Sequence, residues 1–281
     1  MVRALEEKVS QSRPSAAVVW QSCRESSGRW GSLQPGQVRF VVASALNRST
    51  QVRLLRGLLL ATSLLVLFAL LTVAATGPLS SLDVALNSPR RLGQWRDELR
   101  AIDRIGQRAV CLPLLGIVAA VIALRVRAWR PITVAALGVV GLNVFMLVLK
   151  FTLGRGLPRL RDPAFFNGGD IYPSGHTGNV VLVYGLIAYL LIHYGSVRMR
   201  VAPWVVVGVL SVIMVATSLT LRWHWFTDLL GGLLIGGSVL VLTCTIDAII
   251  PWRPIRGPSR PAHAAGATGG STSTRVPSVR R

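Results

Sequence analysis

Six long apolar runs are the feature that most constrains the fold of this chain. A helix needs about 20 mostly apolar residues to cross a hydrocarbon core roughly 30 Å thick, and each run is of that order. The runs lie at residues 54–76, 109–126, 132–151, 177–193, 201–218 and 226–250. The sequence therefore predicts an all-α, polytopic membrane protein with a bundle of six transmembrane helices. Such runs are not typical of a cytosolic globular enzyme.

The basic residues between the runs predict the orientation of the bundle. Six spans place both termini on one side, together with the arginine-rich turns at 125–130 and 198–200. The positive-inside rule assigns that side to the cytoplasm. The segments 77–108 and 152–175 would then face outward. The first of these is itself rich in arginine, which conflicts with the rule.

The polar ends of the chain suggest two tails around one membrane domain. Residues 1–53 are polar and arginine-rich and are expected to form a basic, mostly disordered cytoplasmic tail. Residues 54–252 would form the six-helix domain, and 253–281, rich in Pro, Gly, Ser and Thr, a disordered C-terminal tail. An apolar stripe in the first outward segment predicts either an interfacial helix or a solvated one. Its members are Leu92, Trp95, Leu99 and Ile102.

The charge and the cysteines exclude several classes of protein. Lys and Arg number 31 against 11 Asp and Glu, a formal net charge of +20. In a soluble protein this would suggest nucleic acid, but here the charge lies outside the apolar runs and no nucleic-acid module is present, so membrane lipids are the expected partners. Cys23 lies in the polar tail, whereas Cys111 and Cys244 lie in apolar runs. This pattern does not indicate a disulfide framework or a cysteine-based metal site.

Polar residues concentrate at the outward ends of three spans. Lys150 closes the third run, Ser174, Gly175 and His176 open the fourth, and His224 and Asp228 lie between the fifth and the sixth. Two of the four histidines of the chain therefore meet at matching depth. Further cations lie close in sequence at Arg155, Arg159 and Arg222.

These residues indicate phosphate chemistry. A helix N-terminus with free N–H groups at Ser174 and Gly175 binds anions, and phosphate suits arginine and serine side chains best. Asp228 lies four residues after His224, so it can hold one imidazole nitrogen and leave the other to attack phosphorus. His176 can then protonate the leaving oxygen. We expect no cofactor and no metal, because only Asp170 could complete a zinc site with the two histidines.

The combination of these motifs resembles the type-2 phosphatidic acid phosphatase superfamily over about residues 80–250. The resemblance implies a six-helix bundle and metal-independent cleavage of lipid phosphates or diphosphates. It implies that His224 is the nucleophile that forms a phosphohistidine, that Asp228 orients it and that His176 is the acid. Lys150, Ser174 and the Gly175 backbone would cradle the phosphate.

Two motif positions depart from the family. The first motif, K-x6-R-P, has Leu157 in place of its arginine, and the third, S-R-x5-H-x3-D, has Ser218. Arg155 or Arg159 would replace the first arginine, and Arg222 is the nearest cation to the second. Residues 169–177 are also similar to a pattern of sphingomyelin-synthase-like lipid phosphotransferases.

The leading hypothesis is an integral lipid phosphatase of the cell membrane with an active site on the outer side. It would hydrolyse a phosphatidate-like or polyprenyl phosphate or diphosphate. One alternative is head-group transfer between lipids, in which a lipid hydroxyl replaces water. The other is a catalytically silent phospholipid binder or transporter, suggested by the missing motif arginines. The sequence leaves the particular lipid, the pathway and the oligomeric state open.

Overall fold

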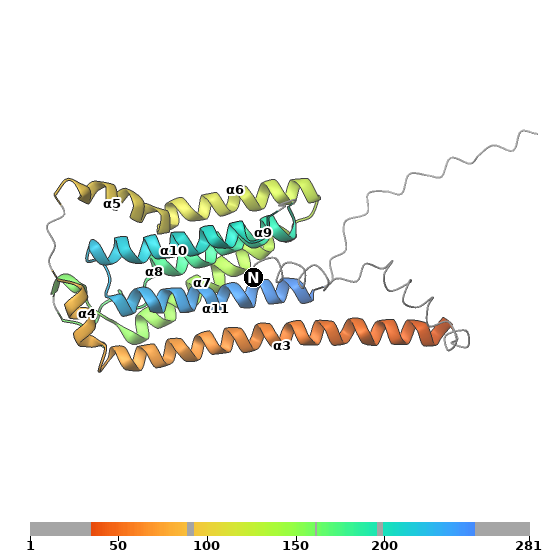
Figure 1. Ribbon diagram of the computed structural model, residues 1–281, viewed down its shortest axis with the longest axis horizontal. Coiled ribbons are helices and arrows are strands. Elements are labelled where there is room, and N and C mark those ends of the chain that lie inside the picture. Colours follow the sequence, from red (N-terminus) through yellow and green to blue (C-terminus); the bar gives the residue numbers. More distant parts are fainter. Residues whose placement is uncertain (1–34, 89–92, 161, 196–198, 251–281) are drawn as a thin grey trace, which may run out of the picture.

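The computed structural model describes residues 35–88, 93–160, 162–195 and 199–250, and every regular element in these ranges is a helix (Figure 1). Six helical segments are long and apolar enough to span a membrane. They are α3 (Pro35–Ala75), α6 (Arg108–Val126), α7 (Arg130–Leu153), a fourth span at Gly175–His193, α10 (Ala202–Thr220) and α11 (Phe226–Ile249). Each contains or overlaps one predicted run, so the prediction of an all-α, six-span membrane protein is confirmed.

Helix α3 begins earlier than the sequence suggested. It starts at Pro35 instead of near Leu54, and its membrane-spanning part begins at Thr50. Residues 35–53 are therefore helical, in contrast to the disordered tail predicted for them. Residues 1–34 and the predicted C-terminal tail at 253–281 lie outside the described residues.

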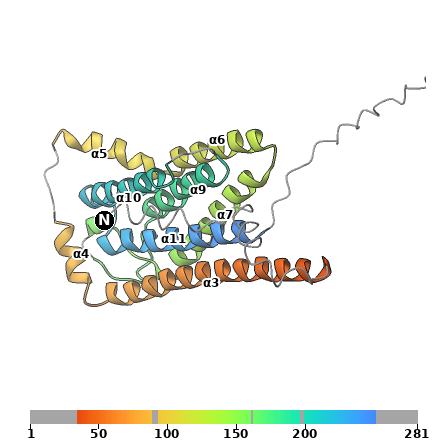
Figure 2. The same ribbon diagram turned by 45° about the vertical axis from the view of Figure 1, so that its right-hand side comes forward.

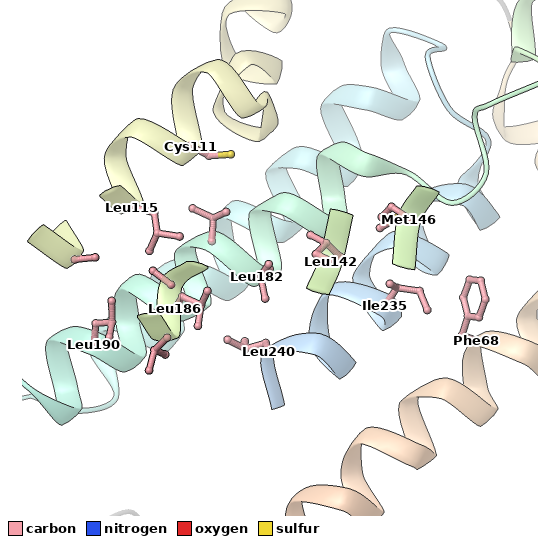
Figure 3. Close-up of a cluster of buried hydrophobic side chains, with 14 of the residues drawn as sticks. Phe68, Cys111, Leu115, Leu142, Met146, Leu182, Leu186, Leu190, Ile235 and Leu240 are labelled. Atoms are coloured by element: carbon pink, nitrogen blue, oxygen red, sulfur yellow. The ribbon is translucent and has the colours of Figure 1, made fainter. Parts of the chain in front are cut away.

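The fourth span is the centre of the bundle. It consists of α8 (Gly175–Asn179), the π-helical segment η3 (Val180–Tyr184) and α9 (Gly185–His193). In its most apolar stretch, 56% of the residues are buried, compared with 17% in the corresponding stretch of α3. Figure 3 shows Leu182, Leu186 and Leu190 of this span facing side chains of α6, α7 and α11. The outer surface of the bundle is apolar, as expected for helices that face lipid.

Glycines allow the fourth span to approach α11 closely. A Cβ atom on Gly232 would lie 2.2 Å from the Thr177 hydroxyl and 2.3 Å from the Ser174 carbonyl oxygen. A Cβ on Gly236 would lie 2.6 Å from the Gly178 carbonyl. These are impossible contacts, so only glycine fits, as its small-residue spacing predicted. The close approach brings the beginning of the fourth span next to the beginning of α11.

Short helices cover one end of the bundle. They are α4 (Ser80–Leu86), α5 (Trp95–Asp103) and the 3-10 turns η1 (Arg104–Gly106) and η2 (Pro158–Leu160). In both Figure 1 and Figure 2, α4 and α5 lie at the end where α3 finishes and where α6 and α11 begin. Helix α5 confirms the helix predicted around Trp95, Leu99 and Ile102, whereas Leu92 lies outside the described residues. Trp95 is exposed, but Asp103 at the other end of α5 is fully buried.

A polar cluster around Asp247 closes the opposite end. Arg130 at the start of α7 donates a hydrogen bond from Nε to Asp247 Oδ1 (2.5 Å), and the hydroxyls of Tyr189 and Tyr194 donate to Oδ2 (both 2.7 Å). Burial and the bond to Asp247 raise the pKa of Tyr194 well above its ordinary value, so its hydroxyl remains a donor. The cluster ties α7, the fourth span and α11 together where the helices leave the membrane.

Candidate active site

A cavity of about 590 Å³ opens at the end of the bundle covered by α4 and α5. It lies where α6, α8 and α11 begin and where α7 ends. Five of the nine residues proposed from the sequence line this cavity: Lys150, Arg159, Gly175, His176 and His224. Residues 106–108 line it as well, so four distant stretches of chain meet around one space.

The two histidines lie on the same cavity. His176 belongs to the first turn of α8, and His224 lies in the turn that precedes α11. The centroids of their rings are 6.0 Å apart. This separation leaves both imidazoles within reach of one small group in the cavity, which is the arrangement that nucleophilic attack and proton transfer at a single phosphorus require.

Asp228 lies behind His224. Its Oδ2 lies 3.7 Å from His224 Nδ1 and accepts a hydrogen bond from the Trp225 backbone N–H (2.9 Å), which caps α11. Asp228 is fully buried and does not line the cavity. Because the carboxylate faces Nδ1, Nε2 is the nitrogen of His224 that remains for the cavity.

Arg155 occupies a different place from the one proposed for a phosphate ligand. Its side chain is fully buried, and all three guanidinium nitrogens bind protein oxygens. Nη1 donates to Asp228 Oδ1 (2.5 Å) and Thr227 Oγ1 (2.8 Å), Nη2 donates to Asp83 Oδ2 (2.7 Å), and Nε donates to the Pro163 carbonyl (2.9 Å). Arg155 therefore supports the Asp228 carboxylate, and its buried side chain does not line the cavity.

Asp83 completes this buried charge cluster. It lies on α4, far from the motifs, and it also accepts hydrogen bonds from the backbone N–H (3.0 Å) and hydroxyl (2.6 Å) of Thr227. The rings of Phe165 and Trp225 lie 4.5 Å and 5.3 Å from the Arg155 guanidinium carbon. Two carboxylates, one guanidinium and two aromatic rings thus fix the first turn of α11 behind His224.

Three cations line the cavity, and one of them was not proposed. Lys150 donates a hydrogen bond to the backbone carbonyl of Asp170. Arg159 lies on η2 and also lines the cavity. Arg108 lies in the first turn of α6 and was missed as a site residue. In the sequence it is one of several arginines in the first outward segment, and its only signal is its position at the start of a span, which mirrors Lys150 at the end of one.

Two other proposed ligands do not line the cavity. Arg222 has a left-handed backbone (φ 57°), and its Nη2 lies 3.4 Å from the Pro158 carbonyl. The Ser174 hydroxyl is buried and has no hydrogen-bond partner within the described part of the chain. The neighbouring Gly175 does reach the cavity, so the backbone at the start of the fourth span is the part that faces it.

Tyr172 anchors the segment that leads into the fourth span. Its fully buried ring stacks on Phe68 of α3 (centroids 5.7 Å) and meets Phe165 edge-on (4.9 Å). Its hydroxyl lies 2.6 Å from the Thr72 hydroxyl. Burial raises the pKa of Tyr172 to about 12, so the phenol stays neutral. The contacts join α3 to the turn that carries Ser174 and His176.

His176 also has a carboxylate partner that the sequence did not reveal. Asp103, the last residue of α5, places Oδ2 3.4 Å from His176 Nε2. Its Oδ1 accepts a hydrogen bond from Ser218 Oγ (2.9 Å). Each of the two site histidines is thus backed by a buried aspartate.

Comparisons with known proteins identify the family of this chain. The family model described as PAP2 superfamily matches residues 109–249. Phosphatidylglycerophosphatase B of Bacillus subtilis (strain 168) is 28% identical over 195 residues, which cover 65% of this chain and 93% of that protein. A crystal structure of a transmembrane PAP2-type phosphatidylglycerolphosphate phosphatase from Bacillus subtilis is similar with a TM-score of 0.59 and 25% identity. The similarity covers 68% of this chain and 97% of that one.

Proposed function

This chain belongs to the PAP2 superfamily and is an integral membrane lipid phosphatase, and we propose that it hydrolyses its substrate through a phosphohistidine on His224. The substrate class that we propose is a lipid phosphate monoester of the phosphatidylglycerophosphate or phosphatidate type. The Bacillus relative, which is named for phosphatidylglycerophosphate, supports the first of these. Polyprenyl phosphates and diphosphates carry the same terminal phosphate and belong in the same test.

The observation that carries the proposal is the pair of imidazoles on one cavity, with ring centroids 6.0 Å apart. His224 Nε2 attacks phosphorus, and the bond from phosphorus to the lipid oxygen breaks. His176 donates a proton to that oxygen, so the lipid leaves as a neutral alcohol. Asp228 stabilises the positive charge that develops on His224 during the attack.

The cations of the cavity supply the binding energy for the phosphate. Lys150, Arg108 and Arg159 come from three different elements, and the Gly175 backbone lies at the N-terminus of the fourth span. Cations and helix N-termini stabilise the charge that spreads over the phosphoryl oxygens in the transition state. Arg108 and Arg159 thus supply the charge that the two altered motif positions lack.

The second half of the reaction regenerates the enzyme. A water molecule attacks the phosphohistidine, gives a proton to the now neutral His176, and the phosphorus–nitrogen bond breaks. Inorganic phosphate leaves, and both histidines return to their starting protonation states. Every proton moves between a histidine, the lipid oxygen and water, so the cycle balances.

We propose that the reaction is metal-independent. Within the described ranges, no three His, Cys, Asp or Glu side chains lie close enough together to hold a metal ion. Asp170 lines the cavity, but it does not form a cluster of three with the histidines. We propose further that the cavity faces outward, because the basic turns lie at the other end of the bundle.

A substrate panel tests the proposal. Purified protein is incubated with phosphatidylglycerophosphate, phosphatidate, polyprenyl phosphates and polyprenyl diphosphates, with and without a chelator, and with labelled diacylglycerol as an acceptor. We expect release of inorganic phosphate that the chelator does not reduce and that His224→Ala abolishes. A labelled phospholipid as the main product would instead show head-group transfer. Undiminished release by His224→Ala would refute the assignment of the nucleophile.

A further inference from the structure

Asp103 is buried without an evident structural reason for its charge. It is 0% exposed at the end of α5, and the bond from Ser218 satisfies only its Oδ1. Its Oδ2 and His176 Nε2 lie 3.4 Å apart, and both atoms are buried and have no hydrogen-bond partner within the described residues. A carboxylate is costly to bury unless a donor or a positive charge compensates for it.

We propose that Asp103 is the positioning residue of His176, so that each site histidine works as a His–Asp pair. This inference rests on the proposed phosphohistidine reaction and adds a second carboxylate to it. Asp103 does not line the cavity, and it therefore acts on the substrate only through the imidazole.

The contact selects which nitrogen of His176 exchanges protons. A carboxylate beside Nε2 keeps the hydrogen on that nitrogen in both the neutral and the charged ring. Nδ1 then carries the mobile proton. In the first step the bond from Nδ1 to hydrogen breaks as the proton moves to the lipid oxygen. In the second step Nδ1 takes a proton from the attacking water, and Nε2 keeps its hydrogen throughout.

The charges around His176 make such a partner useful. Lys150 of α7 and Arg108 of α6 line the same cavity as His176, together with His224 from the turn before α11. Positive charge nearby disfavours the protonated imidazole that the first step needs. Asp103, from α5, places a negative charge 3.4 Å from Nε2 of the ring. The carboxylate therefore stabilises the acid form of His176 in a cavity built to hold an anion.

Ser218 leaves the carboxylate free for this role. Its hydroxyl binds one oxygen of Asp103 from α10, and Oδ2 remains for the histidine. An arginine at position 218, as in the family's third motif, would offer a forked donor that competes for both oxygens. The serine thus fixes the orientation of Asp103 without neutralising it.

The test compares two substrates that differ in their leaving group. A lipid alcohol is a poor leaving group and needs a proton from His176, whereas p-nitrophenol leaves readily without one. Values of kcat/KM for a lipid phosphate and for p-nitrophenyl phosphate both report the formation of the phosphohistidine. We expect Asp103→Asn, which keeps the shape and the bond to Ser218, to lower the lipid value about 10²- to 10⁴-fold, the usual contribution of a general acid. The p-nitrophenyl value should fall less than about tenfold, because that leaving oxygen is stable without a proton.

Asp97→Asn is the matched control. Asp97 lies on the same helix, its side chain is 87% exposed, and its ion partner is Arg100. We expect this variant to retain the wild-type values for both substrates. Equal losses for the two substrates in Asp103→Asn, or no loss for the lipid, would overturn the inference, because a residue that only stabilises the fold does not distinguish leaving groups.

A double-mutant cycle separates a positioning role from a structural one. If Asp103 acts through His176, adding Asp103→Asn to His176→Ala should lower kcat/KM for the lipid phosphate no further. A further loss in the double variant would show an independent structural role and contradict the inference. If the wild type did not cleave any lipid phosphate, the proposed function itself would be refuted. The two failures are therefore distinguishable.

Discussion

At the scale of single residues, the role of Arg155 is determined by its tertiary contacts and not by its neighbours in the sequence. Sequence proximity to Lys150 suggested a phosphate ligand, but the side chain lies behind the site, between Asp83 and Asp228. It fixes the Asp228 carboxylate, which lies 3.7 Å from His224 Nδ1. Its influence on catalysis is therefore transmitted through two other side chains.

Arg155→Met should destabilise the protein and inactivate it. The substitution leaves Asp83 and Asp228 buried without their cation, which typically costs about 3–5 kcal/mol. We expect a lower unfolding midpoint in detergent and a loss of kcat greater than any change in KM. Arg100→Met, which removes an exposed ion pair, is the control and should have almost no effect. A stable Arg155→Met protein with only a raised KM would show instead that Arg155 binds the phosphate.

Arg108→Gln and Arg159→Gln should each weaken binding of the phosphate. A hydrogen bond to a charged group contributes about 1.5–3 kcal/mol, so kcat/KM should fall roughly 10- to 150-fold in each variant. Arg104→Gln is the matched control, since Arg104 is exposed on η1 and does not line the cavity. Steady-state kinetics on lipid phosphate micelles provide the measurement. Equal effects at Arg104 and Arg108 would point to general attraction by the basic surface.

Local sequence patterns were sufficient to identify only some of the residues of the site. His176 and His224 could be recognised because short motifs surround them at the ends of predicted spans. Asp83 and Asp103 carry no such signal. Asp83 binds Thr227, which lies 144 residues later in the chain. Asp103 binds Ser218, which lies 115 residues later. Their partners are determined by helix packing, which no local pattern encodes.

At the scale of elements, the contact between the fourth span and α11 places the two histidines. Gly232 and Gly236 of α11 face Thr177 and Gly178 closely enough to exclude any side chain. The distance between the helix N-termini, and hence between the imidazoles, depends on this contact.

Gly232→Ala should separate the helices and reduce activity. The new methyl group would collide with the Ser174 carbonyl, which belongs to the backbone and cannot rotate away. Overpacking usually costs about 1–3 kcal/mol, and a misplacement of 1 Å in an active site can cost about 10²-fold in rate. Gly208→Ala, on the exposed face of α10 with open space around it, should be neutral. Thermal unfolding and phosphate release measure both effects.

The spans themselves were predictable because hydrophobicity and length alone decide which segments cross a bilayer. The early start of α3 at Pro35 was not, since polar residues extend a helix beyond the membrane without an apolar signal. The burial of the end of α5 could not be read from its amphipathic pattern either. That pattern specifies a helix face but not the neighbour on which its last residue lies.

At the scale of the whole molecule, the two ends of the bundle differ in character. One end carries the cavity, and the other carries the Asp247 cluster and the basic turns. We propose that the second end faces the cytoplasm, as the positive-inside rule predicts, despite the arginines of the first outward segment.

Cysteine labelling in intact cells tests this orientation. Cys23, Cys111 and Cys244 are first replaced by serine, and single cysteines are then introduced by Asn167→Cys at the cavity end and Met199→Cys at the other. Both positions are exposed. We expect a membrane-impermeant maleimide to label Asn167→Cys in intact cells and Met199→Cys only after permeabilisation. The reverse pattern would place the active site in the cytoplasm.

The most direct measurement is a search for the covalent intermediate. Enzyme is mixed with ³²P-labelled lipid phosphate, quenched within milliseconds and examined for bound label. The arrangement of His224, Asp228 and His176 predicts a base-stable, acid-labile label at His224 in the wild type and none in His224→Gln. Phosphate release without any such label, or a label that persists in His224→Gln, would contradict it.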